Sequence, residues 1–501
     1  MSAPGAARRR PAAFLDHLAV DRDAGAPVAV QIADRLRALV LAGGIVRGTR
    51  LPATRRLAAT LGVSRTTVTA AVDILAAEGF VEARHGSGTY VAATLPADRL
   101  AGSGRRPAAA AGPQLSTRGM ALAGTTVAAP GMRLFTPGMP ALDAFPLDEW
   151  RRALARAQRL HGTGLLHLAD PRGWGPLRAA IAAYVGPARG VVCSPEQVVV
   201  LASARQAVAL AAHLLADRGE RVWIEDPGYP DARAALAAAG LEPVAVPVDG
   251  QGIDVAAGRR LAPDARLAAV TPSHQYPLGA VMSLERRLAL LDWARRAGAA
   301  VVEDDYDGEF RYGGRPITAL YGLDGGDRVL YVGSFSKVMF PALRLAYLVA
   351  PARLVDAVAA ARRAAHSEPP ALTQAALAEF VAGEGFTQHI RRMRLLYRAR
   401  QDALVALVRR HLAGALAVTP SDAGMHLVGR LDPALEDRRV VQIAAADGLG
   451  ATALSRYAAG PRRPNGLVLG YAAHDEAALA DGVRRLARAI AAAARRKVAH
   501  G

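Results

Sequence analysis

Val329-Leu-Tyr-Val-Gly-Ser-Phe-Ser-Lys337 is an apolar run that ends in two serines and a lysine. The run over residues 329–332 predicts a buried strand. Only two of the 62 basic residues are lysines, and the other, Lys497, lies four residues from the C-terminus. An arginine replaces a lysine in most ion pairs, but a guanidinium cannot lose its proton and form an imine with an aldehyde. We therefore predict that Lys337 is a Schiff-base lysine; the alternative is a leftover surface lysine.

Five further apolar runs alternate with alanine- and leucine-rich helical stretches on either side of this one. They cover residues 197–201, 221–224, 267–270, 299–302 and 346–349. Strands that alternate with helices predict an α/β domain with a mainly parallel sheet and flanking helices. We place this domain at residues 132–501.

Polar and charged side chains directly follow four of the predicted strands. The segments are Asp226-Pro-Gly-Tyr229, Thr271-Pro-Ser-His-Gln-Tyr-Pro-Leu-Gly279, Glu303-Asp-Asp-Tyr-Asp307 and Ser334-Phe-Ser-Lys337. In open α/β sheets, ligands bind at the carboxyl ends of the strands. A lysine, a carboxylate, a tyrosine and a phosphate-binding group together suit pyridoxal 5'-phosphate: its aldehyde takes the lysine, its pyridinium nitrogen an anion, and its phenolic oxygen a hydroxyl donor. We expect this cofactor, and no metal site.

Three of these features each have a structural alternative. An acidic run such as Glu303-Asp-Asp is ordinarily a solvated loop, but here it ends an apolar strand. Tyr229 follows Pro-Gly, so it either stacks on a cofactor ring or packs within a turn. Arg344 lies between two leucines and needs an anion, which is either a cofactor phosphate or a structural carboxylate.

A separate module is predicted over residues 27–92, after a polar, alanine-rich N-terminus at 1–26. Apolar residues from Val28 to Gly43 have helical spacing. Thr54 is predicted to cap a short helix through Leu61, Gly62 to make the turn, and Ser64 to cap a second helix. This is helix-turn-helix spacing.

The second of these helices has an apolar and a polar face. It is expected to bury Val68, Val72 and Leu75, and to present Arg65, Thr66 and Thr69 to phosphates and base edges in a major groove. Residues 80–91 predict two strands around a glycine turn, a wing. The formal charge of +18 supports a polyanionic partner. The alternative is a small helical bundle with a hairpin that binds no nucleic acid.

Residues 27–92 resemble the winged helix of GntR-type bacterial regulators. They share its pattern of Pro-x-x-Arg, Gly-Val-Ser-Arg-x-Thr-Val, Glu-Gly and Gly-Ser-Gly-Thr. The resemblance implies that the module binds double-stranded operator DNA. The DNA contacts that it implies are Arg55, Ser64, Arg65, Thr67 and the wing at His85-Gly86.

Residues from about 132 to 490 resemble fold-type-I aminotransferases, which have a smaller C-terminal subdomain. Joined to the winged helix across a linker at 93–131, the whole chain resembles the MocR/PdxR-type regulators; Glu-Asp-Asp-Tyr-Asp-x-Glu-Phe-Arg-Tyr (303–312) is specific to that group. The resemblance implies that Lys337 forms the imine, that Asp304 contacts the pyridine nitrogen and that Tyr306 contacts the phenolic oxygen. It also implies that Tyr229 stacks on the cofactor ring and that Ser334 and Arg344 bind the phosphate. It also implies Arg456 for a substrate carboxylate, with Arg462 and Arg463 as competitors.

Three positions depart from the aminotransferase pattern. The phosphate-binding turn, usually Gly-Ser/Thr-Gln-Gln-Ala-Leu, is Ser203-Ala-Arg-Gln-Ala-Val208, so a hydroxyl has moved and Arg205 is new. Arg205 either holds the phosphate or fills its site. The tyrosine that usually reaches the partner subunit's cofactor is Leu168, and the asparagine before Pro-x-Gly is Tyr276. These departures predict weaker or differently arranged cofactor binding and at most vestigial half-transamination.

The sequence thus predicts a transcription regulator that senses an amine, an amino acid or vitamin B6. The resemblance implies a homodimer. Two alternatives remain: a working aminotransferase whose winged helix is incidental, and a cofactor-free regulator. No stretch approaches 18 uncharged apolar residues, and no apolar run follows Arg8-Arg-Arg10, so we expect neither a membrane span nor a secretory signal. A single cysteine, Cys193, excludes an intrachain disulfide and suits the cytoplasm.

Overall fold

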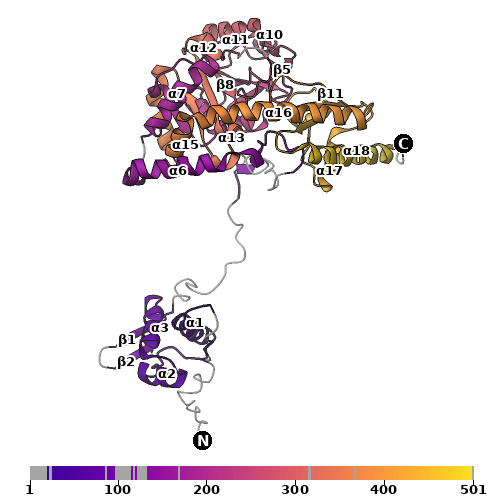
Figure 1. Cartoon of the computed structure of the whole chain (residues 1–501). Coiled ribbons are helices and arrows are strands. Elements are labelled where there is room, and N and C mark those ends of the chain that lie inside the picture. The colour runs from indigo at the N-terminus through magenta and orange to yellow at the C-terminus, as the bar shows by residue number, and fades with distance from the viewer. Residues whose placement is uncertain are drawn as a thin grey trace. The chain divides into compact units, whose positions relative to one another are not determined.

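A computed structural model of the chain describes residues 18, 20–21, 25–84, 87–95, 114–116, 119–120, 133–167, 170–313, 317–365 and 368–498. The chain divides into two compact units, Met1–Gln114 and Leu115–Gly501. Each unit is described by itself (Figure 1). Among the described residues, no helix is long and apolar enough to cross a membrane.

The first unit is a three-helix winged helix-turn-helix. Its elements are α1 (Val28–Leu41), α2 (Thr54–Leu61), α3 (Arg65–Ala77), β1 (Val81–Arg84) and β2 (Gly88–Val91), the two strands pairing antiparallel. Gly62 ends α2 in the left-handed conformation, as a tight turn between two helices requires. Ser64 caps α3, its Oγ accepting a hydrogen bond from the backbone N–H of Thr67 at 3.1 Å.

Two predictions for this unit were wrong in detail. The N-cap of α2 is Ala53, and Thr54 is already helical and makes no side-chain cap. Ala53 has the extended backbone of a cap residue, so the chain turns one residue earlier than the threonine suggested. On α3, Val68 and Leu75 are buried, as predicted, but Val72 is only half-buried.

The second unit is an α/β domain around an eight-stranded sheet of order β3-β10-β9-β8-β7-β4-β5-β6. The strands are β3 (Val198–Leu201), β4 (Arg221–Asp226), β5 (Glu242–Asp249), β6 (Gly252–Ile253), β7 (Leu267–Val270), β8 (Ala300–Asp305), β9 (Val329–Ser334) and β10 (Ala346–Val349). The pairings from β5 through β4, β7 and β8 to β9 are parallel, and β10 is antiparallel to both neighbours. The predicted fold class and all six predicted strands are confirmed.

Side chains on alternate positions of this sheet belong to two separate cores. Val198 and Val200 of β3 lie in one core, and Val199 and Leu201 lie in the other. The first core takes residues from α7 (Gly175–Arg189) and α11 (Leu284–Ala297), and the second from α8 (Ala204–Leu215), α9 (Pro230–Ala238) and α14 (Val355–Ala365). The sheet is therefore buried on both faces, which explains why its strands are continuous apolar runs.

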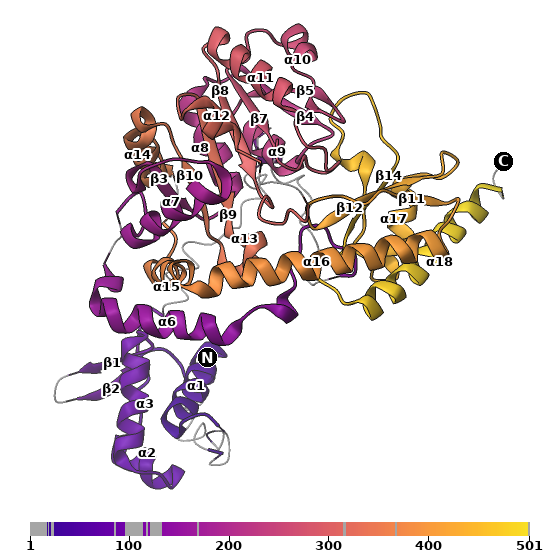
Figure 2. The same ribbon diagram turned by 45° about the horizontal axis from the view of Figure 1, so that its top comes forward.

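The remaining helices of this larger part lie around the sheet (Figure 2). They are α6 (Leu147–His161), α10 (Val255–Leu261), α12 (Leu320–Asp324), α13 (Phe335–Val338) and α15 (Ala371–Ala382). The long helix α16 (Glu384–His411) runs from this part into a smaller C-terminal subdomain (Figure 2).

That subdomain is built on an antiparallel sheet of order β11-β12-β14-β13. Its elements are β11 (Leu416–Val418), β12 (His426–Leu431), β13 (Thr452–Ala453), β14 (Gly466–Gly470), α17 (Asp437–Ala446) and α18 (Glu476–Val498). The smaller subdomain expected from the resemblance is therefore present.

Candidate functional site

Lys337 lies on α13, the single helical turn that begins where β9 ends. The side chain is half-buried, and its Nζ donates a hydrogen bond to the carbonyl oxygen of Gly138 at 2.8 Å. Burial lowers the pKa of this lysine, against the opposing attraction of Asp307 and Asp304. A lowered pKa increases the fraction of neutral amine, which is the form that attacks an aldehyde.

Asp304 is the penultimate residue of β8, which pairs in parallel with β9. The residue is 9% exposed, and its Oδ1 has no hydrogen-bond partner among the described residues. Burial, together with Asp305 and Asp307, raises the pKa of Asp304 to about 7. A buried carboxylate without a partner is costly, and a cation placed against it would relieve that cost.

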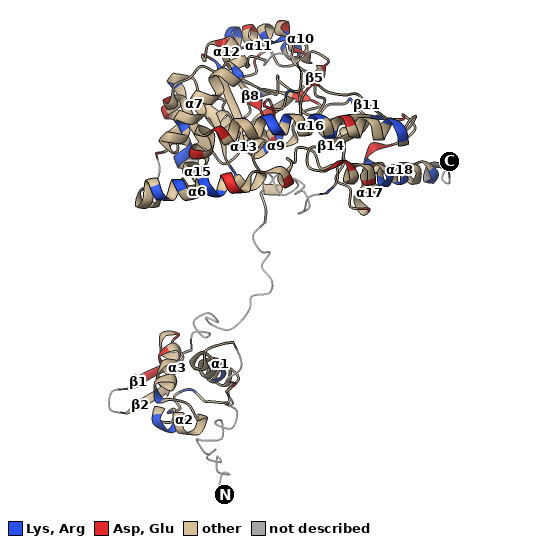
Figure 3. Cartoon of the chain, in the orientation of Figure 1, with Lys and Arg blue, Asp and Glu red and all other residues tan. Residues whose placement is uncertain are grey.

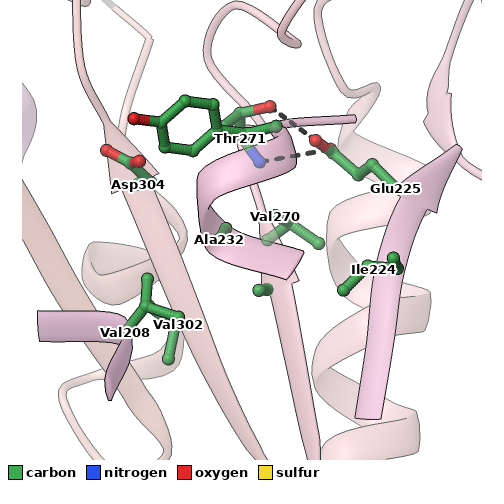
Figure 4. Close-up of a pocket in the computed structure, with 10 residues that line it drawn as sticks. Val208, Ile224, Glu225, Ala232, Val270, Thr271, Val302 and Asp304 are labelled. Carbon is green, nitrogen blue, oxygen red and sulfur yellow. Dashed lines mark hydrogen bonds between the residues drawn. The ribbon is translucent and has the colours of Figure 1, made fainter. Parts of the chain in front are cut away.

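A small cavity opens beside Asp304, between the sheet and the helices α8 and α9 (Figure 4). Its volume is about 20 Å³, too small for an aromatic ring, so it marks the floor of the site. Figure 4 shows Thr271 and Glu225 joined there by two hydrogen bonds, from the Thr271 hydroxyl at 2.6 Å and its N–H at 3.1 Å. Burial raises the pKa of Glu225 to about 7.

Tyr229 also lines this cavity, from the turn between β4 and α9. It is half-buried, and its hydroxyl donates to Asp231 Oδ2 at 3.2 Å. Its ring meets the ring of Tyr276 edge-on, with centroids 5.8 Å apart. The structure therefore brings Tyr229 and Asp304 to one cavity, as the predicted site requires.

Tyr306 lies two residues past Asp304 and contacts a buried histidine. Its hydroxyl is 2.9 Å from Nδ1 of His274, and that nitrogen is also 3.0 Å from Oδ2 of Asp307. Burial raises the pKa of Tyr306 well above its ordinary value, so its hydroxyl keeps its proton at neutral pH. The tyrosine is thus a hydrogen-bond donor, the role expected of a residue on a phenolate oxygen.

The candidate phosphate ligands lie at the ends of two strands. Ser203 caps α8, with its Oγ accepting from the N–H of Gln206 at 3.2 Å, and Ser334 caps α13. Arg344 is exposed and forms no ion pair with any described residue. Its φ of 52° is left-handed, a conformation that costs about 1–2 kcal/mol for a residue with a side chain. A strained arginine that lacks an anion is consistent with a ligand role.

The departures from the aminotransferase pattern can now be placed. Arg205 is 54% exposed in its side chain and lies 3.7 Å from Asp231, so it does not fill a buried site. Tyr276 is half-buried, and its hydroxyl is 3.0 Å from the hydroxyl of Tyr457. Leu168 lies outside the described residues.

Arg456 follows β13 in a 3-10 turn, Leu454–Tyr457. Its side chain is exposed and has no ion-pair partner among the described residues. The adjacent Tyr457 contacts Tyr276, which lies before Pro277 and Leu278 in the loop after β7. Arg456 is therefore close in sequence to the site, but its guanidinium has no contact with the other candidates.

The candidate DNA-reading face is the N-terminal end of α3 with the adjacent α2, where basic residues colour the ribbon blue in Figure 3. Arg55, Arg65 and Thr66 are exposed there. The hydroxyls of Thr66 and Thr67 each lie 2.7 Å from the Oγ of Ser64, which keeps the cap rigid. The wing tip at His85-Gly86 lies outside the described residues.

Two residues of the site were missed by sequence reasoning. Gly138, which accepts the hydrogen bond from Lys337, lies 199 residues before it, and no local pattern connects them. His274, which contacts Tyr306, lies inside a motif that follows a strand, so its position was a signal that we did not use.

The residues present fit pyridoxal phosphate by their chemistry. Lys337 is a desolvated amine just past the end of β9, and Asp304, near the end of the adjacent β8, has a buried Oδ1 with no hydrogen-bond partner among the described residues. Tyr306 is a protonated donor, and Arg344 is a cation without an anion among the described residues. An aldehyde, a pyridinium, a phenolate and a phosphate are the groups that these side chains would hold.

Comparison with known proteins agrees with both units. Residues 135–486 match the family described as Aminotransferase class I and II, and residues 28–91 match Bacterial regulatory proteins, gntR family. In fold, the chain is similar to LysN, an alpha-aminoadipate aminotransferase from Thermus thermophilus solved in complex with N-(5'-phosphopyridoxyl)-L-leucine. The TM-score is 0.65 at 32% identity, covering 72% of this chain and 92% of that one.

The most informative relatives carry both units in one chain. The chain is 33% identical over 453 residues to the HTH-type pyridoxine biosynthesis transcriptional regulator PdxR of Corynebacterium glutamicum, covering 90% of this chain and 93% of that one. It is 43% identical over 480 residues to the Probable rhizopine catabolism regulatory protein MocR of Rhizobium meliloti, covering 95% and 96%. The chain therefore belongs to the MocR-type family of HTH-type transcriptional regulators, in which a GntR-family winged helix precedes a class I and II aminotransferase domain.

Proposed function

We propose that the chain is a DNA-binding transcription regulator that holds pyridoxal phosphate through Lys337 and senses an amine, an amino acid or the vitamin itself. Residues 27–92 bind operator DNA, residues 93–131 are a linker, and residues 132–501 bind the cofactor. The observation that carries this proposal is Asp304, whose buried Oδ1 has no hydrogen-bond partner among the described residues; it lies near the end of β8, next to the strand that leads to Lys337.

Each side chain has one role in holding the cofactor. When bound, pyridoxal phosphate supplies an electrophilic aldehyde carbon and an electron-withdrawing ring. Lys337 provides the amine that bonds to that carbon, and its lowered pKa keeps the amine reactive. Asp304 keeps the ring nitrogen protonated, because the ion pair offsets the cost of the buried carboxylate. Tyr306 donates to the phenolic oxygen, and Tyr229 covers the ring.

The phosphate is held by hydroxyls, a helix N-terminus and arginine. Ser203 places its hydroxyl at the N-terminus of α8, where backbone N–H groups favour an anion. Ser334 and Arg344 add a second hydroxyl and a cation. Arg205, exposed beside Asp231, supplies a further cation near the same helix end.

Sensing follows from competition for the aldehyde. An amine effector would compete with the Lys337 amine for the same aldehyde, and Arg456 would hold the carboxylate of an amino-acid effector. A ligand that binds one arrangement of the domain more tightly shifts the population toward that arrangement. If the two arrangements differ in operator affinity, the ligand changes operator affinity, and operator DNA changes ligand affinity by the same factor. We further propose that the chain acts as a homodimer, in which each winged helix has its own half-site.

The test is operator affinity measured against effector concentration for three proteins. Wild type, Lys337→Ala and Lys337→Arg are titrated with operator DNA selected from a random duplex pool, with pyridoxal phosphate and candidate amines present. Lys337→Arg keeps the cation but forms no imine. We expect the effector to change operator affinity in wild type only. Equal responses in all three proteins would contradict the proposal.

A working aminotransferase is the second candidate, favoured by the 32% identity to LysN. Tyr276 argues against efficient turnover, because its hydroxyl is engaged with Tyr457 and it lacks the amide of the usual asparagine. Sustained transfer between an amino acid and a keto acid, over many turnovers per site, would establish the enzyme. A single turnover that stops would fit the regulator.

A further inference from the structure

A large cavity lies between the α/β part and the C-terminal subdomain, apart from the small cavity at Asp304. Its volume is about 1260 Å³. One wall comes from the ends of β4 and β5 and the loop after β7, and the other from β11, β12 and residues 461–465. Figure 2 shows the C-terminal sheet, orange to yellow, beside the end of the large sheet that carries β4 and β5. We refer to it as the interdomain cavity.

Two buried histidines line the interdomain cavity, and each has a ring nitrogen without a partner. His274 and His426 are 3% and 2% exposed, and their ring centroids are 5.4 Å apart. Nε2 of His274 and Nδ1 of His426 make no hydrogen bond to any described residue. A buried polar atom left unpaired costs about 1–3 kcal/mol, so these two atoms indicate a missing hydrogen-bonding group.

The contacts of the other nitrogen in each ring limit the hydrogen-bonding role of these two atoms. Nε2 of His426 is 2.9 Å from the carbonyl oxygen of Pro277, to which it must donate. Burial lowers the pKa of His426 to about 4, so the ring is neutral and its free Nδ1 is an acceptor. Nδ1 of His274 lies 3.0 Å from Oδ2 of Asp307 and 2.9 Å from the Tyr306 hydroxyl, so this nitrogen is engaged and Nε2 is the free one. The free Nδ1 of His426 therefore suits a ligand with an N–H or O–H group, and Nε2 of His274 suits a hydroxyl, which both donates and accepts.

Glycines give the His274 ring the space that it occupies. A Cβ at Gly424 would lie 2.1 Å from Cε1 of the ring, and one at Gly279 would lie 3.1 Å from Nε2. Both glycines have positive φ, 95° and 75°. On the side of Gly279, only backbone atoms therefore lie close to Nε2 of His274. A side chain at position 279 would crowd that nitrogen.

Arginines on the same cavity have no anion. The four are Arg311, Arg430, Arg462 and Arg463, and none forms an ion pair with any described residue. Arg311 is half-buried, and its Nε and one terminal nitrogen, Nη1, are buried without a partner. Of the acids on the lining, Asp226 already accepts from two backbone N–H groups and Asp249 pairs with Arg286. The third, Asp422, forms no ion pair with any described residue, so it offsets one of the four arginines. The cavity therefore has unused positive charge.

We propose that the interdomain cavity binds a small acid that also carries hydroxyl or ammonium groups. The arginines take the acid group, His426 accepts a hydrogen bond from one of its donors, and His274 bonds to a hydroxyl. This site is separate from Lys337 and does not depend on the cofactor. It adjoins the cofactor site at one residue, because His274 lines the cavity and its Nδ1 lies 2.9 Å from the Tyr306 hydroxyl.

The probe is D-gluconate, which has a carboxylate and five hydroxyls but no amine, so it cannot react with an aldehyde at Lys337. Binding to the full chain is measured by isothermal titration calorimetry. Two controls each lack one half of the recognition: sorbitol has no acid group, and hexanoate has no hydroxyls. We expect gluconate to bind at one site per chain, at least about tenfold more tightly than either control.

Variants locate the bound gluconate. Arg311→Gln and Arg430→Gln each remove a cavity arginine, and we expect each to weaken gluconate binding about tenfold. Arg344→Gln alters the candidate phosphate site, and Arg152→Gln alters an exposed arginine on α6; both should bind gluconate as wild type does. Loss of binding in Arg344→Gln alone would place the acid in the cofactor site and overturn the proposal. Absence of gluconate binding in wild type, or binding equal to both controls, would also overturn it, whatever the outcome for pyridoxal phosphate.

Discussion

The Nζ of Lys337 donates its hydrogen bond to Gly138, whose backbone is left-handed with φ of 70°. A Cβ at Gly138 would lie 2.8 Å from that Nζ. Position 138 therefore requires glycine for two reasons: its left-handed backbone conformation, and the space that the side chain of Lys337 occupies. Two segments 199 residues apart in the chain thus fix where the reactive amine lies.

Gly138→Ala should therefore impair cofactor binding without removing any group that binds it. The methyl group displaces the lysine nitrogen, and the left-handed backbone adds about 1–2 kcal/mol of strain. We expect affinity for pyridoxal phosphate to fall at least about tenfold. Gly164→Ala is the control, because a Cβ there meets nothing within 4 Å. Equal affinity in the two variants would show that the Gly138 contact has no role.

Asp304→Asn should stabilise the cofactor-free protein above neutral pH. The pKa of Asp304 is about 7 in the folded protein and 3.8 ordinarily, so the folded state binds the proton more tightly. Wild-type stability therefore falls as pH rises from about 4 to 7, and stays lower above 7. An asparagine carries no charge at any of these pH values, so the variant avoids the cost of burying a charged carboxylate. That cost is on the order of 2–4 kcal/mol of unfolding free energy at pH 8.

The measurement is the free energy of unfolding of both cofactor-free proteins at pH 5 and pH 8. Other buried acids with raised pKa values, such as Glu225 and Glu303, remain in both proteins and cancel in the difference. Addition of pyridoxal phosphate should reverse the order, because wild type gains the ion pair to the ring nitrogen. A difference that is the same at both pH values would contradict the assignment of an uncompensated carboxylate.

Ser64 should contribute to stability and to DNA binding in ways that two substitutions separate. Ser64→Ala removes the cap of α3 and should destabilise the winged helix by about 1 kcal/mol. Ser64→Asp keeps a capping oxygen, so its stability should match wild type, but its negative charge should weaken DNA binding. Thermal unfolding and operator titration measure the two effects. Equal loss of stability in both variants would exclude the capping role.

Arg65 should contact the DNA backbone or a base edge from the start of α3. Arg65→Ala should lower operator affinity about tenfold and, if the contact is to phosphate, reduce the slope of log affinity against log salt by about 1. Arg35→Ala, on α1, is the control for lost charge alone. If both variants bind the operator alike at every salt concentration, Arg65 is not at the interface.

The six predicted strands and the helix-turn-helix were predictable because their signals are local, whereas the strands of the C-terminal sheet, β11 to β14, were not predicted. Each of the six predicted strands is a short apolar run bounded by polar residues, and the helix-turn-helix is set by Gly62 and Ser64. The strand β5 was missed because Pro243 and Pro247 interrupt its pattern. Prolines are tolerated there because β5 lies near the sheet edge, next to the two-residue strand β6.

The candidate site was predictable only in part, because some of its contacts join segments that lie far apart in the sequence. Asp304 and Tyr306 lie at the end of β8 and Lys337 lies just past the end of β9, so a parallel sheet alone brings their segments together. Gly138 and the interdomain cavity depend on contacts between distant segments, which no local pattern encodes. That the Asp304 carboxylate lacks a partner is a property of packing, and it is visible only in three dimensions.

The most direct test of the central claim is to identify what Lys337 binds. The purified chain, incubated with pyridoxal phosphate, is examined by visible absorption, then reduced with borohydride, and the peptide that contains Lys337 is analysed by mass. The account predicts a visible band that borohydride abolishes and a phosphopyridoxyl group on Lys337, both absent in Lys337→Ala. No band and an unmodified Lys337 after incubation with excess cofactor would contradict it.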